Sequence, residues 1–371
     1  MTSTLSPEVR AQFREAAASS AHTATVDRAA LVSLRESGLL ATAVPERFGG
    51  AGGDGAAINR VVTEIATVNP SLAIIAFQHF AVTSRISEWG TEEQRHRLLP
   101  PLADGRLLAA SAWSEPNAGA AKQNVSSTAV LRADGTWLLN GAKSFATGAG
   151  VADIYLVLVR TETTDDFGAE GQRAHYGASG QSFFLVWGTN PGLRPDTGPV
   201  LAGMRGSATG LIELVECVVP REDRLGPLGE AAEIIAGVRR TGATLGSVAL
   251  GVAVEAFDLA VEHAERRGLL SLPTVRRHLV ELSVKLESAR AIVTLAGARS
   301  SADPGATTLR SKIHATETAE EICMDVARML GSTGYLSDHP VARMIADVRG
   351  VALMGPTNDL CRTLLAATWE R

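Results

Sequence analysis

The order of secondary-structure signals along the 371-residue chain is the feature that most limits its fold. Residues 7–108 repeat apolar side chains at intervals of three and four, as at Ile58, Val62 and Ile65, and this spacing predicts helices. From about residue 107 short β-rich runs replace that pattern, and helical spacing returns after Pro227. Because strands and helices do not alternate, the order predicts an α+β fold, mostly helical, with segregated layers and no βαβ units.

The middle of the chain predicts an antiparallel sheet. Five short runs are rich in β-formers: residues 125–131, 137–139, 154–159, 183–187 and 211–215. Turn dipeptides separate them, and Asp134-Gly135 and Asn140-Gly141 are typical of tight hairpins. The polar, glycine-bearing stretch 162–182 is expected to be an exposed, mobile connection.

Composition excludes several classes of protein. With 45% apolar residues, 20% charged residues and a net charge of −5, the chain is typical of a soluble globular protein, and it has no basic excess for nucleic acid. Residues 68–84 and 241–254 are uncharged or nearly so, but they are too short or too interrupted to span a bilayer. The first residues lack the apolar core of a signal peptide, so a cytoplasmic protein without membrane association is expected.

The cysteines and histidines predict neither disulfides nor a metal. Cys217, Cys323 and Cys361 are scattered and odd in number, which favours free, packed thiols. No cluster of cysteine and histidine has the spacing of metal ligands, so we predict no metal site.

Several ordered segments carry a family resemblance. They comprise residues 45–50, 111–120, 139–148, 205–220 and 330–335, the last followed by Pro340, Arg343 and Asp347. Alone, the Pro-Asn-Ala-Gly of the second is simply a turn, and the Asn-Gly of the third is an ordinary hairpin signal. In this order they resemble the acyl-CoA dehydrogenase family of flavoenzymes.

The resemblance implies both an architecture and a cofactor. It implies a helical amino-terminal domain over residues 1–108, a barrel-like β domain over 109–226 and a carboxyl-terminal four-helix bundle over 227–371. FAD is then expected between the β domain and the bundle. The implied activity is FAD-dependent oxidation of an acyl thioester at its α,β C–C bond, with hydride transfer to flavin N5.

Four residues of the β domain are candidates for the flavin site. An isoalloxazine ring needs a flat apolar surface and hydrogen-bond donors at its polar edge. Phe145 or Trp113 offers the first, and the hydroxyls of Ser114 and Thr147 offer the second. Ser114 and Thr147 fall on the family's flavin-contacting positions; the alternative is that they only cap turns.

Further FAD contacts implied by the resemblance lie in the bundle. In the family, FAD also reaches a neighbouring subunit, which implies a homodimer or homotetramer. Arg267 and Gly331 fall on the positions concerned, and Arg328 stands where the family often has glutamine. Arg267 is otherwise an exposed arginine at a helix end, and the phenylalanine-glutamine pair that usually follows it is absent. Thr357 and Asp359 fall on further FAD-contacting positions.

The catalytic base of the family is missing. Desaturation of a thioester needs a base for the α-proton, and relatives use a glutamate in an apolar pocket. The two family positions for it hold Gly355 and Thr241. Asp359, one helical turn after Gly355, is a weak candidate, and Glu115 is interpreted as structural.

The substrate contacts also depart from the family pattern. Gly242 replaces an arginine that helps to hold CoA, and Ala120 replaces a loop serine. Arg240 is a candidate substitute for the arginine, and Gly355 leaves room for substrate. His79 is either a core histidine or a residue of the substrate cleft. These changes weaken the prediction of acyl-CoA and keep open a thioester on a carrier protein, or a small molecule that is not a thioester.

Three functions therefore remain open. The first is the dehydrogenase just described, which acts on a small acyl substrate and passes electrons to a partner protein. The second is a flavin monooxygenase that uses oxygen and needs no carboxylate base. The third is a non-catalytic protein that keeps the fold as a flavin-binding or interaction module.

Overall fold

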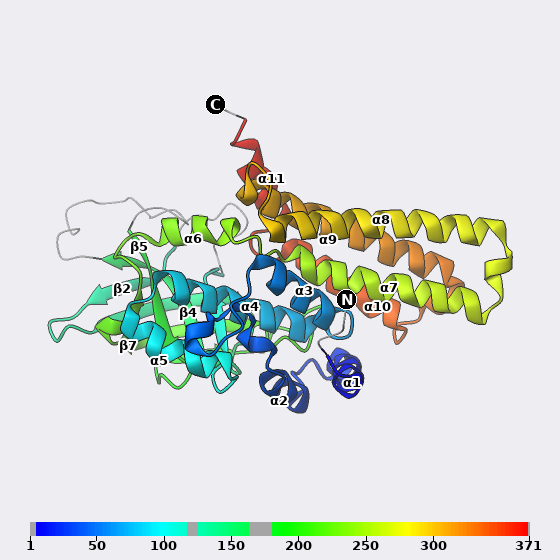
Figure 1. The fold of residues 1–371 in the computed structure, drawn as a ribbon. Helices are drawn as coiled ribbons and strands as arrows, with labels where there is room; N and C mark the ends of the chain where they lie inside the picture. Colours follow the sequence, from blue (N-terminus) through cyan, green and yellow to red (C-terminus); the bar gives the residue numbers. More distant parts are fainter. Residues whose placement is uncertain (1–4, 117–124, 163–179, 370–371) are drawn as a thin grey trace.

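The computed structural model of the protein describes residues 5–116, 125–162 and 180–369 (Figure 1). Eleven α-helices occur in these ranges. They are α1 (Pro7–Thr23), α2 (Arg28–Glu36), α3 (Gly55–Ala66), α4 (Pro70–Trp89), α5 (Glu92–Ala103), α6 (Ala231–Arg240), α7 (Gly246–Arg266), α8 (Pro273–Ala298), α9 (Pro304–Met329), α10 (Pro340–Leu353) and α11 (Asn358–Ala366). The predicted order, helices before and after a β-rich middle, is confirmed, and with it the mostly helical α+β class.

Eight strands in the described residues form one sheet. They are β1 (Ala109–Ala112), β2 (Thr128–Leu131), β3 (Trp137–Ala146), β4 (Ile154–Glu162), β5 (Gln181–Trp187), β6 (Leu193–Asp196), β7 (Gly210–Val219) and β8 (Arg224–Leu225). Their order is β6-β7-β3-β2-β4-β5-β8, and β1 pairs with β4. The expectation of an antiparallel sheet is wrong in part, because β4 pairs in parallel with both β1 and β2.

The Asn140-Gly141 dipeptide does not form the predicted hairpin. It lies inside β3, where the pairing with β7 shifts between Leu139 and Gly141. Gly141 has φ +141°, and a Cβ there would lie 2.3 Å from Ser127 Oγ, so the close approach requires glycine. Asn140 Oδ1 accepts a hydrogen bond of 2.8 Å from Glu216 N. Asp134-Gly135 does make the β2–β3 turn, with Gly135 at φ +83°.

The carboxyl-terminal bundle consists of α7, α8, α9 and α10, which extend away from the sheet as an arm (Figure 1). Helix α3 packs against α7 and α8 at the base of this arm. The α3–α7 contact is close because Gly251 has no side chain: a Cβ there would lie 2.5 Å from both Ala66 Cβ and Thr63 O. Helix α11 projects from the base of the arm.

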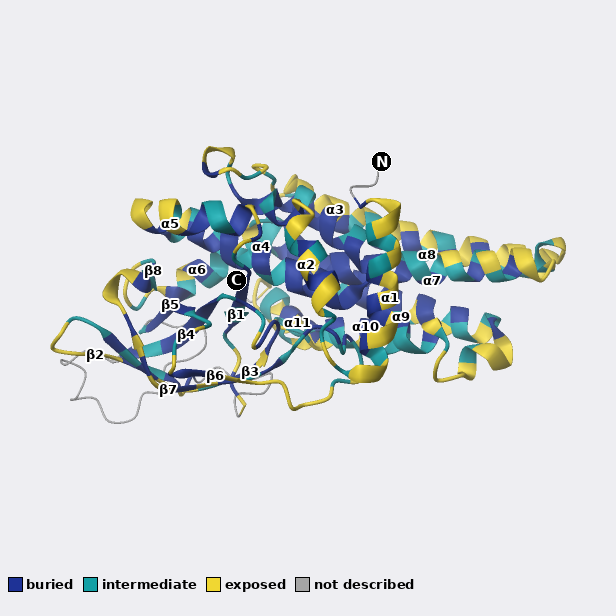
Figure 2. Ribbon diagram, turned by 90° about the horizontal axis from the view of Figure 1, so that it is seen from below, coloured by how far each residue is buried: buried dark blue, intermediate teal, exposed yellow. Residues whose placement is uncertain are grey.

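The hydrophobic cores cross the expected domain boundaries. One core joins α1–α4 to the bundle helices, with residues such as Phe13, Ile65 and Val248. A second joins α4, α5 and α6 to one face of the sheet, and a third lies on the other face. Buried residues are accordingly continuous where the amino-terminal helices meet the bundle (Figure 2). Because these cores share the amino-terminal helices, they fix the sheet relative to the end of the bundle that lies next to it. None of the helices in the described ranges has the length and apolar character needed to cross a membrane.

Candidate functional site

Two loops of the β domain that carry predicted flavin residues are joined to each other. Ser144 N donates a hydrogen bond of 2.8 Å to Ser114 O, which links the end of β3 to the segment after β1. The residue before Ser144 and the residue after Ser114 form an ion pair, in which Lys143 Nζ lies 2.7 Å from Glu115 Oε1. The segment that follows Pro116 includes residues 117–124, and Ala120 therefore lies outside the described residues.

The Glu115–Lys143 ion pair is almost inaccessible, with side chains 4% and 0% exposed. Glu115 also accepts hydrogen bonds from Ser126 N (2.7 Å), Ser126 Oγ (2.6 Å) and Ser127 N (3.0 Å). Burial raises the pKa of Glu115, but the Lys143 ammonium and the Ser126 bonds outweigh it and leave the pKa at about 2. Burial lowers the pKa of Lys143 to about 8, against the pull of Glu115. Glu115 is therefore structural, as predicted, and ties both loops together.

Phe145 presents an aromatic ring to the surface. It is 71% exposed, and its φ of +51° is unusual for a bulky residue. It falls in the second irregularity of the β3–β7 pairing, between Lys143 and Ala146. Such conformations persist where the surroundings enforce them, commonly at ligand sites. Phe145 is thus better placed than Trp113 to lie against a flat ligand.

Trp113 and Thr147 carry further polar groups on the two joined segments. Trp113 packs its ring against Phe183, with centroids 5.0 Å apart, and its buried Nε1 has no hydrogen-bond partner. Thr147 is 6% exposed, and its hydroxyl lies 3.0 Å from Thr209 Oγ1, which in turn lies 2.8 Å from Ser207 Oγ. An exposed aromatic ring and an unpartnered donor on two joined segments supply the two features that a planar ring with a polar edge requires. These residues therefore fit a flavin.

Residues 204–209 form a loop that holds Thr209 in place, a role that the sequence did not predict. Met204 N donates a 2.5 Å hydrogen bond to Asp347 Oδ1 on α10, and Gly206 N donates one of 3.2 Å to Ser71 Oγ on α4. Burial raises the pKa of Asp347 to about 6, although the Met204 bond and Arg343 oppose that rise. The loop is thus fixed to the bundle, to the amino-terminal helices and to the segment that carries Thr147.

The two positions predicted for the family's base, Gly355 and Thr241, have different surroundings. Gly355 is exposed, has no positive φ, and a Cβ there would meet no atom within 4 Å. Thr241 ends α6: its hydroxyl donates to Val238 O at 2.8 Å and accepts from Ala243 N at 3.3 Å. Position 355 can therefore accept a side chain, whereas the Thr241 hydroxyl already has two partners.

Neighbouring candidates are placed less favourably for proton transfer. The Asp359 side chain is 86% exposed and bonds to Arg362 at 3.1 Å, so it lacks the apolar surroundings that suit a carboxylate base. The Thr357 hydroxyl accepts from Leu360 N at 3.1 Å and caps α11. Arg240 is exposed at the end of α6. Gly242 has φ +79°, and a Cβ would lie 2.3 Å from Ala296 O, so this position excludes the arginine of the family.

His79 is a core residue in this structure. It is 0% exposed, and its Nδ1 accepts a hydrogen bond of 3.3 Å from Ala109 N. Burial lowers the pKa of His79 to about 4, which leaves the ring neutral. The alternative of a histidine open to a substrate cleft is not what the structure shows.

The remaining cofactor candidates form a second group at the far end of the arm. Arg267 caps the end of α7, and Arg328 lies in the last turn of α9, bonded to Asp325 at 2.7 Å. Gly331 follows at the start of the 3₁₀ turn η6 (Gly331–Tyr335), with φ +63° and no atom near its Cβ position. Figure 1 shows this end of α7 and α9 well away from the sheet. One chain does not bring the two groups together.

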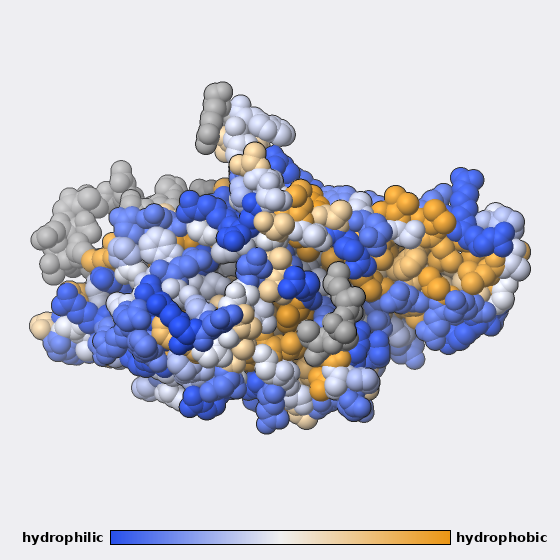
Figure 3. Space-filling view, in the orientation of Figure 1, coloured by the Kyte–Doolittle hydropathy of each residue, from blue (hydrophilic) through white to orange (hydrophobic). Residues whose placement is uncertain are grey.

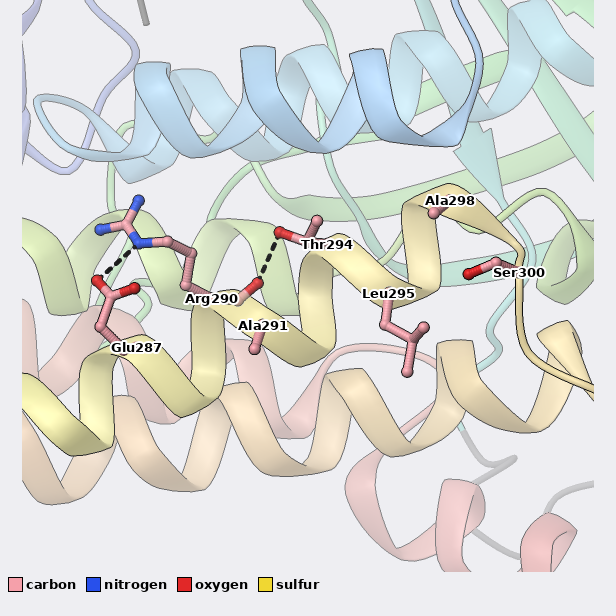
Figure 4. Close-up of a pocket in the computed structure, with 7 residues that line it drawn as sticks. All are labelled: Glu287, Arg290, Ala291, Thr294, Leu295, Ala298 and Ser300. Atoms are coloured by element: carbon pink, nitrogen blue, oxygen red, sulfur yellow. Dashed lines mark hydrogen bonds and ion pairs between the residues drawn. The ribbon is translucent and has the colours of Figure 1, made fainter.

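The pocket of about 450 Å³ in Figure 4 lies on the outward face of α8. It is lined by Glu287, Arg290, Ala291, Thr294, Leu295, Ala298 and Ser300. Glu287 pairs with Arg290 at 3.1 Å, and no predicted site residue takes part. Within the described ranges, no group of three or more His, Cys, Asp or Glu side chains is arranged to hold a metal.

Comparison with known proteins settles the family. Residues 4–106, 110–217 and 235–369 match the N-terminal, middle and C-terminal domains of acyl-CoA dehydrogenases. A probable acyl-CoA dehydrogenase, FadE25 of Mycobacterium tuberculosis, is 30% identical over 93% of this chain and 90% of its own length. The chain belongs to the acyl-CoA dehydrogenase family.

Two further acyl-CoA dehydrogenase relatives bear on the substrate and the fold. The L-prolyl-[peptidyl-carrier protein] dehydrogenase of Pseudomonas fluorescens is 29% identical over 89% of this chain and 87% of its own. The structure of butyryl-CoA dehydrogenase from Megasphaera elsdenii superposes with a TM-score of 0.83 at 25% identity, covering both chains completely. The acyl-CoA dehydrogenase fold therefore spans the whole chain.

Proposed function

We propose that this protein is an FAD-dependent oxidoreductase that oxidises an acyl thioester at the α,β C–C bond. The observation that carries this function is a pair of joined segments, linked by the hydrogen bond from Ser144 N to Ser114 O. One segment carries the exposed Phe145 ring and the other carries the unpartnered Trp113 Nε1 donor. Membership of the acyl-CoA dehydrogenase family supports the reaction class, and a solved structure of similar fold, 26% identical, is described as an FAD-dependent dehydrogenase. The flavin would supply the hydride acceptor.

The chain's own residues have distinct tasks in this proposal. Phe145 covers one face of the ring, and Thr147, Ser114 and Trp113 Nε1 donate to its polar edge. The buried Glu115–Lys143 pair keeps the two loops at a fixed separation, so the donors are preorganised. Thr357 and Asp359 lie at the start of α11, on the bundle side of the site.

The proton-transfer step is where this chain departs from its relatives. Gly355 has no side chain, and the Thr241 hydroxyl already makes two hydrogen bonds, so neither residue can take up the α-proton. This observation favours a second candidate, a flavin monooxygenase, because oxygen chemistry at a reduced flavin needs no carboxylate at these positions. A non-catalytic flavin-binding protein is the third candidate.

The substrate is proposed to be a small acyl group on CoA or on a carrier protein. Gly242 excludes the arginine that helps to hold CoA in the family, and exposed Arg240 is the nearest replacement for contact with a phosphate or carrier. The relative that acts on a prolyl group held by a peptidyl carrier protein supports the carrier alternative. Electrons would pass to a partner protein in the dehydrogenase and to oxygen in the monooxygenase.

Spectral titration of the FAD-loaded protein tests the proposal. Anaerobic loss of the flavin absorbance band at about 450 nm, on addition of acyl-CoA or acyl-carrier thioesters, supports a dehydrogenase. Oxygen uptake with an added flavin reductase, together with a hydroxylated product, supports the monooxygenase. A protein that takes up no flavin refutes both.

Gly355→Glu gives the sharper test, with Gly355→Gln as its matched control. The open space at position 355 admits either side chain. Desaturation that appears only in the Glu variant means that the wild-type chain is not a conventional dehydrogenase. Wild-type desaturation that is unchanged in the Glu and Gln variants means that another group takes the α-proton.

A homodimer or homotetramer is also proposed. The cofactor candidates of the β domain lie at the sheet, whereas Arg267 and Gly331 lie at the far end of the arm (Figure 1). A second copy is therefore needed for both groups to reach one FAD. Helix α8 supports an interface because its outward face carries an apolar stripe: Val280, Val284, Ala291, Leu295 and Ala298. Val280, Val284 and Leu295 are 60%, 64% and 43% exposed. Hydrophobic residues also gather over this arm in Figure 3.

A further inference from the structure

Lys312 is a buried cation inside a ring of oxygen atoms from one turn. Its side chain lies in α9 and is 3% exposed. Nζ donates to Met354 O at 2.9 Å and to Pro356 O, and it lies 3.4 Å from both Ala352 O and Asn358 Oδ1. All these acceptors belong to residues 352–358, the turn that joins α10 to α11.

These oxygens have few other donors. The last carbonyls of a helix have no partner within it, and α10 ends at Leu353. A cation is favoured at this end of a helix, where the macrodipole is negative. Among the described residues no carboxylate is bonded to Lys312. The turn's own oxygens therefore compensate the buried charge, and the charge in turn organises the turn.

Other charged or titratable groups surround this arrangement. Cys361 on α11 donates weakly to Pro356 O at 3.7 Å, and burial raises the pKa of its thiol, which stays neutral. Arg239 on α6 and Arg362 on α11 act electrostatically on that thiol. Glu317 on α9 pairs with Arg362 and lies 3.5 Å from the Asn358 amide.

Gly355 lies between two of the anchored carbonyls. Met354 O and Pro356 O both bond to Lys312, whereas Gly355 is exposed and has open space at its Cβ position. The ammonium thus draws the flanking peptides inward and leaves position 355 facing outward. The place of residue 355 is set by Lys312 from within α9.

We propose that Lys312 is a positioning residue for the substrate site, because its ammonium fixes the 352–358 turn and so places position 355 against the acyl group. This inference rests on the proposed function, in which the space at Gly355 receives the substrate. Lys312 itself does not act as a base, because its ammonium protons are engaged by the turn's oxygens.

Hydrogen exchange of the apoprotein tests the ordering role without any cofactor. In Lys312→Met, amides of residues 352–361 are expected to exchange at least tenfold faster, while those of β3 and the middle of α8 are unchanged. Lys285→Met is the matched control, because that lysine pairs with Glu321 and Asp325 at the surface. Should Lys312→Met not fold, Lys312→Gln keeps two N–H donors and is expected to show intermediate protection.

The pH dependence provides a second arm. Burial lowers the pKa of Lys312 to about 8, below the ordinary lysine value that it regains when the turn opens. The closed turn then binds fewer protons than the open one, so wild-type protection, corrected for intrinsic exchange, is expected to rise above pH 8. Lys312→Met is expected to lack this step. Unchanged protection in Lys312→Met, or equal loss of protection throughout the protein, overturns the ordering role.

Thioester binding to the FAD-loaded protein tests the substrate side. Lys312→Met is expected to raise the Kd for the thioester about tenfold, the equivalent of 1.4 kcal/mol, with FAD affinity unchanged. Normal thioester affinity in this variant overturns the positioning role. Failure of the wild type to bind any thioester overturns the proposed function instead, and hydrogen exchange still decides whether Lys312 orders the turn.

Discussion

Separation of the Glu115–Lys143 pair is expected to destabilise the protein in a way that depends on pH. Lys143→Met leaves a carboxylate with a side chain only 4% exposed and no counter-charge. Loss of one partner of a buried pair costs about 3–5 kcal/mol. The bonds from Ser126 and Ser127 remain, so we expect about 3 kcal/mol at pH 7.

The sign of the pH dependence distinguishes the two single variants. Without Lys143, burial dominates and raises the folded-state pKa of Glu115 above its unfolded value of 4.5. The folded state then binds more protons, so the stability of Lys143→Met relative to wild type recovers as pH falls from 7 to 5. In Glu115→Gln the unpaired Lys143 has a further lowered pKa, and relative stability recovers as pH rises from 7 to 9.

Urea unfolding followed by intrinsic fluorescence at pH 5, 6, 7, 8 and 9 measures these effects. The double variant Glu115→Gln/Lys143→Met is expected to lose less than Lys143→Met alone and to show little pH dependence. Lys285→Met, which removes a half-buried cation paired at the surface, is expected to change stability by at most about 1 kcal/mol. Parallel pH profiles for the two single variants, or additive losses in the double variant, would refute the reasoning.

Three further outcomes are expected. Gly242→Ala costs about 3 kcal/mol in urea unfolding, because φ is +79° and its Cβ would meet Ala296 O at 2.3 Å, whereas Gly355→Ala changes stability by about 0.5 kcal/mol or less. Burial raises the pKa of Asp347 to about 6, so the stability of the wild type relative to Asp347→Asn falls by up to about 3 kcal/mol as pH rises from 4 to 6. A stability difference that does not change with pH contradicts this. Finally, Phe145→Ala and Arg267→Ala chains each bind FAD poorly. Their refolded equal mixture regains about a quarter of the wild-type sites by absorbance, because half of the dimers are mixed and one of the two sites in each is intact; no recovery argues against a shared site.

The sequence predicts the architecture well where the signals are local. Helical spacing over residues 7–108 and after Pro227 reflects long elements that each bury one face. Short edge strands were missed because β6 and β8 have only four and two residues and are defined by pairing with distant partners. The stretch 162–182, expected to be mobile, falls largely in residues 163–179, which lie outside the described residues.

Within the candidate site, the sequence did not predict which charged side chains are buried. Lysine normally faces solvent, so nothing local marks Lys143 or Lys312 as buried. Their partners are remote: Glu115 lies 28 residues from Lys143, and Met354 lies 42 residues from Lys312. The choice between Phe145 and Trp113 likewise needed the structure, because it rests on a positive φ and an exposed ring.

The structure also shows whether the backbone requires glycine at position 355, which the sequence alone could not. Glycine is required where φ is positive or where a Cβ would clash, and neither condition holds at Gly355. Its flanking peptides are already anchored by Lys312, so the turn keeps its shape without any special freedom at this residue. The fold therefore tolerates a glutamate there, and the backbone of the turn does not explain the glycine. Thr241, by contrast, has a structural task at the end of α6, since its hydroxyl donates to Val238 O.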